Sequence, residues 1–273
     1  VCNSGIFSCD LDILKKLIPK INNKTNKKKE YYLTDIFKLA YHDNVDTKSI
    51  LVNEDEFMGV NNKKELAVAE YIAQSKLREK FLIKGVTLID PETVYFSEDT
   101  KIDKDGVIYP NVFIGKNVRI GKGSKILSFS HLEDCSVGKD VTIGPFARLR
   151  PGADIKDEVK VGNFVEIKKS KIDKNSKVNH LTYIGDTEIG KDVNIGAGTI
   201  TCNYDGKNKF KTIIEDGAFI GSNSSLIAPV KIGKNAYVGS GSAISKNIKE
   251  KALGIERTNQ IEIKNWHRKI KKK

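Results

Sequence analysis

Residues 113–126 read FIGKNVRIGKGSKI, and their isoleucines stand six positions apart, at Ile114, Ile120 and Ile126. A helix places apolar residues three or four positions apart, and a half-buried strand alternates, so a period of six fits neither. The period instead requires short flat strands joined by a tight corner at every sixth residue. It predicts a solenoid in which inward aliphatic side chains stack coil upon coil.

The same step of six returns through most of the chain. One register begins at Ile102, a second runs from Ile143 to Ile167, and a third runs from Ile214 to Ile244. Glycine often follows the aliphatic residue at once, and it suits corners where a Cβ would clash or where φ is positive. A β-sandwich with chance spacing would show hairpin signals at irregular intervals, so we favour a parallel β-helix. The residues alone leave its handedness open, because parallel crossovers are normally right-handed.

Faults in the period are informative. Three steps of five are each expected to be absorbed at a corner, namely Leu132 to Val137, Ile167 to Ile172 and Ile184 to Ile189. A much larger step of 19 positions leads from Ile195 to Ile214. The stretch between them is polar and predicts a protruding loop, the kind of position where rigid scaffolds carry functional residues.

The chain divides into four predicted segments. Residues 1–62 lack the period and form a small α/β unit, with helices expected near residues 11–21 and 31–41. Residues 63–85 form a long connecting helix with Asn62 as its N-cap. Residues 86–257 form the β-helix, and residues 258–273 form a basic tail. The fold class is therefore mainly β.

Composition narrows the function classes. Within 273 residues there is no apolar run long enough to span a bilayer and no signal peptide pattern, so we expect a cytoplasmic protein without stable membrane insertion. The four cysteines lack paired spacing, which argues against disulfides or a zinc site. The net charge of +12 comes from lysines spread over corners and two clusters. Because no aromatic residues interleave with them, we expect no nucleic-acid binding.

Histidine is scarce. The four histidines, His42, His131, His180 and His267, are too scattered to supply three zinc ligands, so metal catalysis is not expected in the solenoid. A histidine at a solenoid corner is more often a solvated turn residue than a catalytic group. His180 is singled out by its surroundings, because it lies in Asn179-His180-Leu181-Thr182-Tyr183-Ile184-Gly185-Asp186, shortly before the predicted loop.

Four segments carry a family resemblance. They are residues 144–153 (GPFARLRPGA), residues 161–168 (VGNFVEIK), the His180 segment, and residues 194–206 (NIGAGTITCNYDG). Together they resemble the acetyltransferase half of the bacterial bifunctional enzyme that makes UDP-N-acetylglucosamine, a UDP-N-acetylglucosamine pyrophosphorylase and glucosamine-1-phosphate N-acetyltransferase. The resemblance implies a left-handed β-helix, a homotrimer, and acetyl-CoA as co-substrate, bound where subunits meet.

The resemblance also implies site residues. His180 matches the base that takes a proton from the amine of glucosamine 1-phosphate, a task that suits a group titrating near neutral pH. Arg150 and Lys168 match the cations at the sugar phosphate, and Tyr183 and Asn194 match further sugar contacts. The positions that match acetyl-CoA contacts are Ala197, Asn203, Tyr204, Ser222, Ser240 and Arg257. The product would enter peptidoglycan and lipopolysaccharide precursors.

The chain start resembles the end of the family's nucleotidyltransferase domain. Asn3 matches a sugar contact and Asn61 a magnesium ligand of that domain. Since the glycine-rich UTP loop is missing, magnesium would serve only an incomplete site, and we expect no uridylyl transfer from this chain alone. The start without Met suggests a fragment or a split gene.

Two other functions compete with acetyl transfer to glucosamine 1-phosphate. One is a trimeric β-helix scaffold that has lost catalysis, and the other is a related hexapeptide acyltransferase with a different sugar acceptor or acyl chain. The His180→Ala variant and a panel of acceptors and acyl-CoA donors would separate them.

Overall fold

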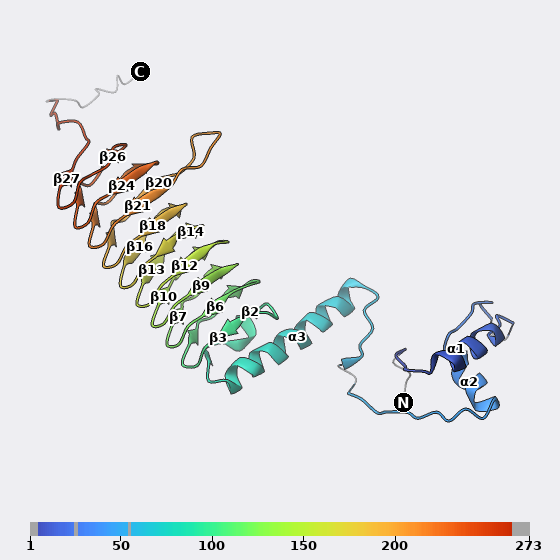
Figure 1. Cartoon of the computed structure of the whole chain (residues 1–273). Helices are drawn as coiled ribbons and strands as arrows, with labels where there is room; N and C mark the ends of the chain where they lie inside the picture. Colours follow the sequence, from blue (N-terminus) through green and yellow to red (C-terminus); the bar gives the residue numbers. More distant parts are fainter. Residues whose placement is uncertain (1–4, 25–26, 54–55, 264–273) are drawn as a thin grey trace, which may run out of the picture. The chain divides into compact units, whose positions relative to one another are not determined.

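The computed structural model describes residues 5–24, 27–53 and 56–263, and its chain divides into two compact units between Ala73 and Gln74 (Figure 1). Each unit is described by itself. The first contains α1 (Leu11–Leu17), the 3₁₀ turn η1 (Ile18–Lys20), α2 (Asp35–His42) and the first half of α3 (Lys63–Ile83). Its described residues hold helices and irregular chain without a strand. The α/β unit expected over residues 1–62 thus shows only its helical part, and residues 1–4 lie outside the described residues.

A small core holds the first unit. Leu17 of α1 and Ile36 and Ala40 of α2 are buried, with Phe7 packed beside them. The helix expected over residues 31–41 begins only at Asp35. Ile36 and Ala40 face this core, whereas Tyr31 is exposed.

Helix α3 begins as predicted. The Asn62 side chain accepts a hydrogen bond from the Glu65 N–H at 3.0 Å, which confirms Asn62 as the N-cap. The Glu65 carboxylate in turn accepts from the Asn61 N–H at 2.6 Å, and this bond lowers the pKa of Glu65. Gly85, with φ of 87°, ends the helical turn beyond Ile83 because few other residues adopt that conformation.

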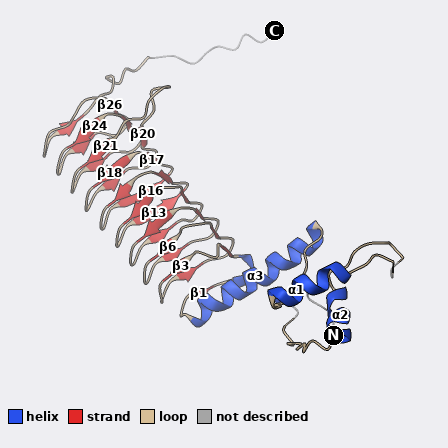
Figure 2. Cartoon of the chain, turned by 45° about the vertical axis from the view of Figure 1, so that its right-hand side comes forward, coloured by secondary structure: helices blue, strands red, loops and turns tan. Residues whose placement is uncertain are grey.

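The second unit is a parallel β-helix of three sheets, which we call sheets A, B and C (Figure 2). Sheet A contains β1 (Thr87–Leu88), β4 (Val107–Ile108), β7 (Lys125–Ile126), β10 (Thr142–Ile143), β13 (Lys160–Asn163), β16 (Lys177–His180), β19 (Asn194–Ile195), β22 (Phe219–Ile220), β25 (Tyr237–Val238) and β27 (Leu253–Gly254).

Sheet B follows sheet A in each coil, and a 3₁₀ turn, η3 (Pro91–Thr93), precedes its first strand. Sheet B contains β2 (Tyr95–Phe96), β5 (Phe113–Ile114), β8 (His131–Leu132), β11 (Arg148–Leu149), β14 (Glu166–Lys168), β17 (Tyr183–Gly185), β20 (Ile200–Cys202), β23 (Ser225–Ile227) and β26 (Ala243–Ile244).

Sheet C completes each coil. It contains β3 (Lys101–Ile102), β6 (Arg119–Ile120), β9 (Cys135–Val137), β12 (Ala153–Ile155), β15 (Lys171–Ile172), β18 (Thr187–Ile189), β21 (Thr212–Ile214) and β24 (Val230–Ile232). We name the corners between the sheets AB, BC and CA.

The predicted period of six is confirmed. Ile143, Leu149 and Ile155 take the inward position of sheets A, B and C in one coil, and each is at most 1% exposed. Fully burying one such side chain is worth about 1.5–3 kcal/mol. The three predicted steps of five all fall at corner BC, between strands such as β8 and β9, so shorter corners absorb them.

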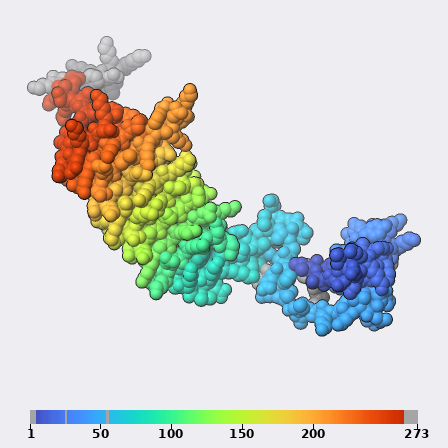
Figure 3. Space-filling model, viewed as in Figure 1, coloured from blue at the N-terminus to red at the C-terminus, as the bar shows by residue number. Residues whose placement is uncertain are grey.

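The interruption of the six-residue period begins one step later than predicted, after residue 201 rather than after Ile195. Thr201 is 1% exposed and holds the inward position of β20, six residues after Ile195, so the register continues through it. The pattern of aliphatic residues missed this position because threonine is polar. Residues 203–211 then leave corner BC as a protruding loop between β20 and β21, coloured orange in Figure 3.

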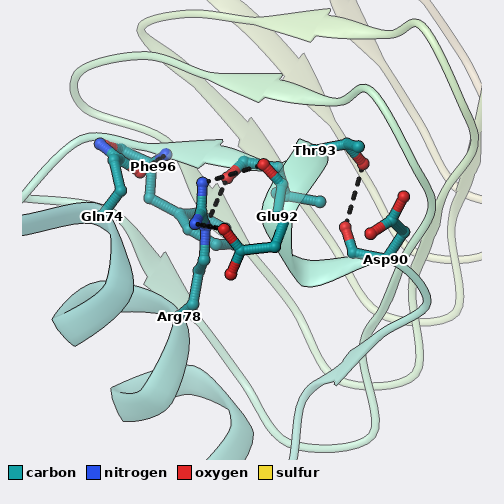
Figure 4. Close-up of polar contacts among 7 residues, drawn as sticks. Gln74, Arg78, Asp90, Glu92, Thr93 and Phe96 are labelled. Carbon is teal, nitrogen blue, oxygen red and sulfur yellow. Dashed lines mark hydrogen bonds and ion pairs between the residues drawn. The ribbon is translucent and has the colours of Figure 1, made fainter. Parts of the chain in front are cut away.

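The open edge of the first coil is covered by the second half of α3 (Figure 4). The Gln74 carboxamide donates to the Phe96 carbonyl at 2.8 Å and accepts from the Phe96 N–H at 2.9 Å, as a neighbouring strand would. Arg78 donates to the Val94 carbonyl and pairs with the Glu92 carboxylate, each at 3.1 Å. These bonds satisfy backbone groups that an exposed edge strand would leave open to other chains.

Candidate functional site

His180 stands at corner AB, where β16 ends. Strands β13 and β16 are four residues long and extend to this corner, so Asn163 and His180 face each other in register. The exposed His180 ring places Nδ1 2.9 Å from the Asn163 side-chain oxygen. Because a carboxamide oxygen only accepts, Nδ1 donates, and Nε2 remains the basic nitrogen.

Most of the residues matched to acetyl-CoA continue the same corner. Backbone hydrogen bonds join the successive coils there, from Gly198 N–H to the His180 carbonyl at 3.2 Å, and from Asn223 N–H to the Ala197 carbonyl at 2.7 Å. The Arg257 guanidinium donates to the Ser240 carbonyl at 3.0 Å. The structure therefore aligns a column at corner AB, made of His180, Ala197, Ser222, Ser240 and Arg257.

A group of positive charges lies across sheet B, at corner BC. Arg150 Nη1 lies 2.7 Å from Glu166 Oε1, and this hydrogen bond raises the pKa of Arg150. Lys168 ends β14, one coil further along. The neighbouring Lys209 ammonium, with a smaller contribution from Arg150, lowers the pKa of Lys168. Within the described residues, no ion pair joins Lys168 or Lys209 to a carboxylate, so the two ammonium groups could hold an anion.

Tyr183 connects the two corners. It is the register partner of Glu166 and starts β17, directly after the His180 corner. Its ring and hydroxyl lie so close to Gly185 that a methyl group there would overlap them. The ring therefore lies along sheet B toward corner BC. An extended chain rises about 3.3 Å per residue, so the five steps from His180 to Gly185 span at most roughly 17 Å.

Asn194 lies apart from this group. It starts β19 on sheet A, in register with Lys177 and Phe219. Within one chain the structure therefore does not bring Asn194 to the positive charges of corner BC.

Of the two matched loop residues, Tyr204 faces solvent and Asn203 faces the solenoid. Tyr204 is exposed, and its hydroxyl donates to the Gly206 carbonyl at 2.6 Å. Asn203, expected to protrude with it, is only 7% exposed, and its carboxamide donates to the Asp186 carboxylate. The expectation for Asn203 was wrong in this respect, because the amide finds its acceptor at the base of the loop.

The remaining expected residues lie in the first unit. Asn3 falls outside the described residues. Asn61 precedes α3, and its backbone N–H is bonded to Glu65. Across residues 5–24, 27–53 and 56–263, no group of three or more His, Cys, Asp or Glu side chains could hold a metal ion. Magnesium binding stays a prediction.

Sequence reasoning gave no role to Asn163, Glu166 or Asp186. All three lie inside the segments that carry the resemblance, but their contacts join different coils. Asn163 reaches His180 and Glu166 reaches Arg150 across 17 and 16 residues of sequence. The exact coil register would have been needed to find these pairs.

Comparison with known proteins identifies relatives of this chain. The family described as "Bacterial transferase hexapeptide (six repeats)" matches residues 134–169 and 211–246. The "Bifunctional protein GlmU" of Paramagnetospirillum magneticum is 49% identical over 97% of this chain, and that of Zymomonas mobilis is 48% identical over 100%. The chain is a relative of the bifunctional GlmU proteins. It spans 59% and 60% of the length of these two GlmU proteins.

The hexapeptide repeats and the GlmU relationship assign the solenoid to the left-handed parallel β-helices. Among solved structures, a UDP-N-acetylglucosamine acyltransferase from Francisella novicida matches 61% of this chain and 68% of its own, with 18% identity and a TM-score of 0.41. LpxA from Bacteroides fragilis, also a UDP-N-acetylglucosamine acyltransferase, matches 59% and 69%, with 22% identity and the same TM-score. No helix in the described part of the chain is long and apolar enough to cross a membrane.

Proposed function

We propose that this chain transfers the acetyl group of acetyl-CoA to the amine of glucosamine 1-phosphate, giving N-acetylglucosamine 1-phosphate for UDP-N-acetylglucosamine synthesis. The observation that carries the proposal is that His180, held by Asn163, stands at one edge of sheet B and that Arg150, Lys168 and Lys209 gather at the other edge. A base and a set of cations for a phosphate are the two groups that an amino sugar phosphate requires.

The proposed reaction needs one base and no acyl-enzyme. The sugar amine attacks the thioester carbonyl carbon, forming the C–N bond, and the C–S bond breaks to release CoA thiolate. His180 Nε2 takes the proton from the amine nitrogen and returns it to the departing thiolate. Because Asn163 holds the proton on Nδ1, Nε2 is available at the start of each turnover.

The sugar phosphate is proposed to bind at corner BC. Arg150 offers a planar fork, and Lys168 and Lys209 offer point charges. A dianion there would relieve the repulsion that lowers the pKa of Lys168. Tyr183 lies between this phosphate position and His180 and supports the sugar ring. Glu166 orients Arg150 through their 2.7 Å contact.

The column at corner AB supports the proposed acetyl-CoA site. Ala197, Ser222 and Ser240 are small, and methyl groups at the intervening Gly196 and Gly221 would overlap the backbone of the next coil. The corner therefore stacks its coils closely and presents the exposed Ser222 and Ser240 on the coils beyond His180. Arg257 at its far end would face the CoA phosphates, as Arg commonly does.

We further propose that the chain forms a homotrimer with its acyl site at the subunit boundary. An apolar ladder runs down corner AB toward His180 and consists of Phe129, Phe146, Phe164 and Leu181, which are 46–60% exposed. Successive phenyl rings stack with centroids 4.9 and 5.2 Å apart. All four residues have positive φ, a costly conformation for bulky side chains.

The other corners serve as an internal comparison for this ladder. Every positive-φ position at corners BC and CA is Gly or a polar residue, such as Asn117 or Asp140. Folding of a single chain therefore does not require phenylalanine at these positive-φ positions. The exposure of these phenyl rings indicates that a partner covers them. A straight ridge that repeats once per coil matches a surface with the same repeat, which a second copy of this solenoid provides.

The test is a thiol-release assay with acetyl-CoA and glucosamine 1-phosphate. Wild-type protein should release CoA, and His180→Ala should lose about 10²–10⁴-fold in kcat. Release with another amino sugar or acyl-CoA only would favour a related acyltransferase. A trimer without any release would favour the scaffold, and near-normal turnover by His180→Ala would remove His180 as the base.

A further inference from the structure

The protruding loop has a closed structure of its own. At its neck, the Phe210 N–H donates to the Asn203 carbonyl at 2.8 Å, and Tyr204 bridges antiparallel to Lys209. At its tip, Asp205 Oδ1 accepts from the Lys207 and Asn208 N–H groups, at 2.8 and 2.6 Å. Residues 203–211 therefore form a short two-stranded ribbon. The contacts at its neck determine where the ribbon points.

Asp186 holds both ends of that neck. It lies at corner BC of the preceding coil with φ of 47°, and its side chain accepts from the buried Asn203 carboxamide. Its carbonyl accepts from the Thr212 N–H at 3.2 Å, where the chain re-enters sheet C. Its own N–H donates to the Lys168 carbonyl at 3.1 Å. One residue thus ties the loop to the coil that carries Lys168.

The loop brings two like charges together. Lys209 lies close enough to Lys168 to lower its pKa, and both lysines repel each other when no anion is present. Lys169, Asp186 and Lys209 also line one shallow pocket with Phe210 and Lys211. Something other than charge must keep Lys209 in place. The Asn203–Asp186 bond ties one end of the loop to the preceding coil, and the Lys211–Glu188 ion pair ties the other end.

We propose that Asp186 is a positioning residue, which holds the Asn203 carboxamide so that loop 203–211 keeps Lys209 beside Lys168 for the substrate phosphate. Asp186 acts through the loop and does not touch substrate. The role of the phosphate rests on the proposed function, whereas the tethering of the loop stands on the contacts alone.

Two substitutions separate the hydrogen bond from the charge. Asp186→Gly removes the acceptor and tolerates the positive φ, leaving the buried Asn203 amide unpaired. Asp186→Asn keeps an acceptor oxygen and also suits positive φ, but removes the charge. Asp192→Gly is the matched control, because Asp192 has φ of 57° at corner CA and accepts from the Asn175 carboxamide at 2.7 Å, away from the loop.

The first measurement is steady-state kinetics with glucosamine 1-phosphate. Asp186→Gly should raise KM for this substrate about tenfold, because an unpaired buried donor frees the loop. Its kcat should change less than about twofold, since His180 stands at the other corner. Asp186→Asn and Asp192→Gly should resemble wild type. An unchanged KM in Asp186→Gly would overturn the proposal, as would an equal rise in Asp186→Asn, which would assign the effect to charge.

The second measurement needs no turnover. Trypsin cleavage after Lys207 and Lys209, followed by mass spectrometry on the full chain, should be about tenfold faster in Asp186→Gly than in wild type or Asp192→Gly. Equal cleavage in all variants would contradict the tether. If wild type shows no acetyl transfer while cleavage still follows Asp186, the proposed function fails and the tether stands.

Discussion

At the scale of single residues, the orientation of His180 depends on a neighbour one coil away. Asn163 is partly buried beside Phe164 and has its side-chain oxygen 2.9 Å from His180 Nδ1. An acceptor bonded to one ring nitrogen fixes the proton on that nitrogen and leaves the other nitrogen unprotonated. The proposed base therefore depends on a pair of residues rather than on His180 alone.

This pair gives a first prediction. Asn163→Ala should lower kcat about tenfold or more, because the imidazole can then turn and present the wrong tautomer, while KM for acetyl-CoA stays within about twofold. Asn175→Ala, at corner CA, serves as the control with wild-type kcat. Thiol-release kinetics decides the matter, and a kcat equal to wild type in Asn163→Ala would show that the contact does not orient the base.

The buried thiol of Cys135 gives a second prediction. It is 5% exposed in β9, and burial raises its pKa to about 12. The thiol therefore stays protonated and unreactive at pH 8, since alkylation requires the thiolate. Iodoacetamide at pH 8 followed by peptide mapping should leave Cys135 unmodified in the folded chain and modify it in denaturant. Rapid modification of Cys135 in folded protein would mean that this coil opens readily.

Several of these residue-level features could be predicted from the sequence, and others could not. Resemblance supplied His180, Arg150 and Lys168, and the structure places them at the two edges of one sheet. Asn203 was expected to protrude with the polar loop between Ile195 and Ile214, yet its carboxamide bonds to Asp186 at the base of the loop. Whether a polar side chain turns in or out at an insertion depends on a partner in another coil, which local sequence does not reveal.

At the scale of elements, the strands followed the period of six closely. Their inward positions were predictable because only aliphatic side chains fill the core without leaving polar atoms unpaired. Thr201 breaks the aliphatic six-residue register, and its hydroxyl accepts from the Gly185 N–H at 2.8 Å, which satisfies it inside the solenoid. A polar residue with an internal partner is invisible to a hydrophobic pattern, so the loop was placed too early.

Helix α3 offers the third prediction, because one carboxamide, that of Gln74, supplies both of its hydrogen bonds to the Phe96 backbone. Gln74→Met keeps the volume but removes both hydrogen bonds to Phe96, leaving a buried N–H and carbonyl unpaired. This should cost about 1–3 kcal/mol in the free energy of unfolding, which thermal or urea unfolding can measure. The exposed Lys76→Met is the control and should change stability by less than about 0.5 kcal/mol. Equal stability of the two variants would show that the amide is not the cap.

At the scale of the whole molecule, the apolar ladder of corner AB would link the proposed trimer to the proposed activity. The ladder leads directly into His180 through Leu181, so a subunit that covers it also borders the column matched to acetyl-CoA. Sequence could not have revealed the ladder, because Phe129, Phe146 and Phe164 are separated by 17 and 18 residues and align only once the coils are stacked. A hydrophobic residue outside the core becomes informative only when its neighbours in space are known.

The ladder supplies the last prediction. Replacing Phe146 and Phe164 together by Asn should keep the fold, because Asn111 and Asn223 already occupy the same positive-φ position at this corner. Removing two exposed phenyl rings should weaken a subunit contact by several kcal/mol, since each aromatic anchor contributes about 1–3 kcal/mol. Sedimentation velocity should then show monomer where wild type shows trimer, with acetyl transfer lost in parallel. The stacked pair Phe219 and Tyr237 on sheet A, replaced by Thr, is the matched control and should leave the trimer intact. A trimer that survives the Asn substitutions would place the subunit contact elsewhere on the solenoid.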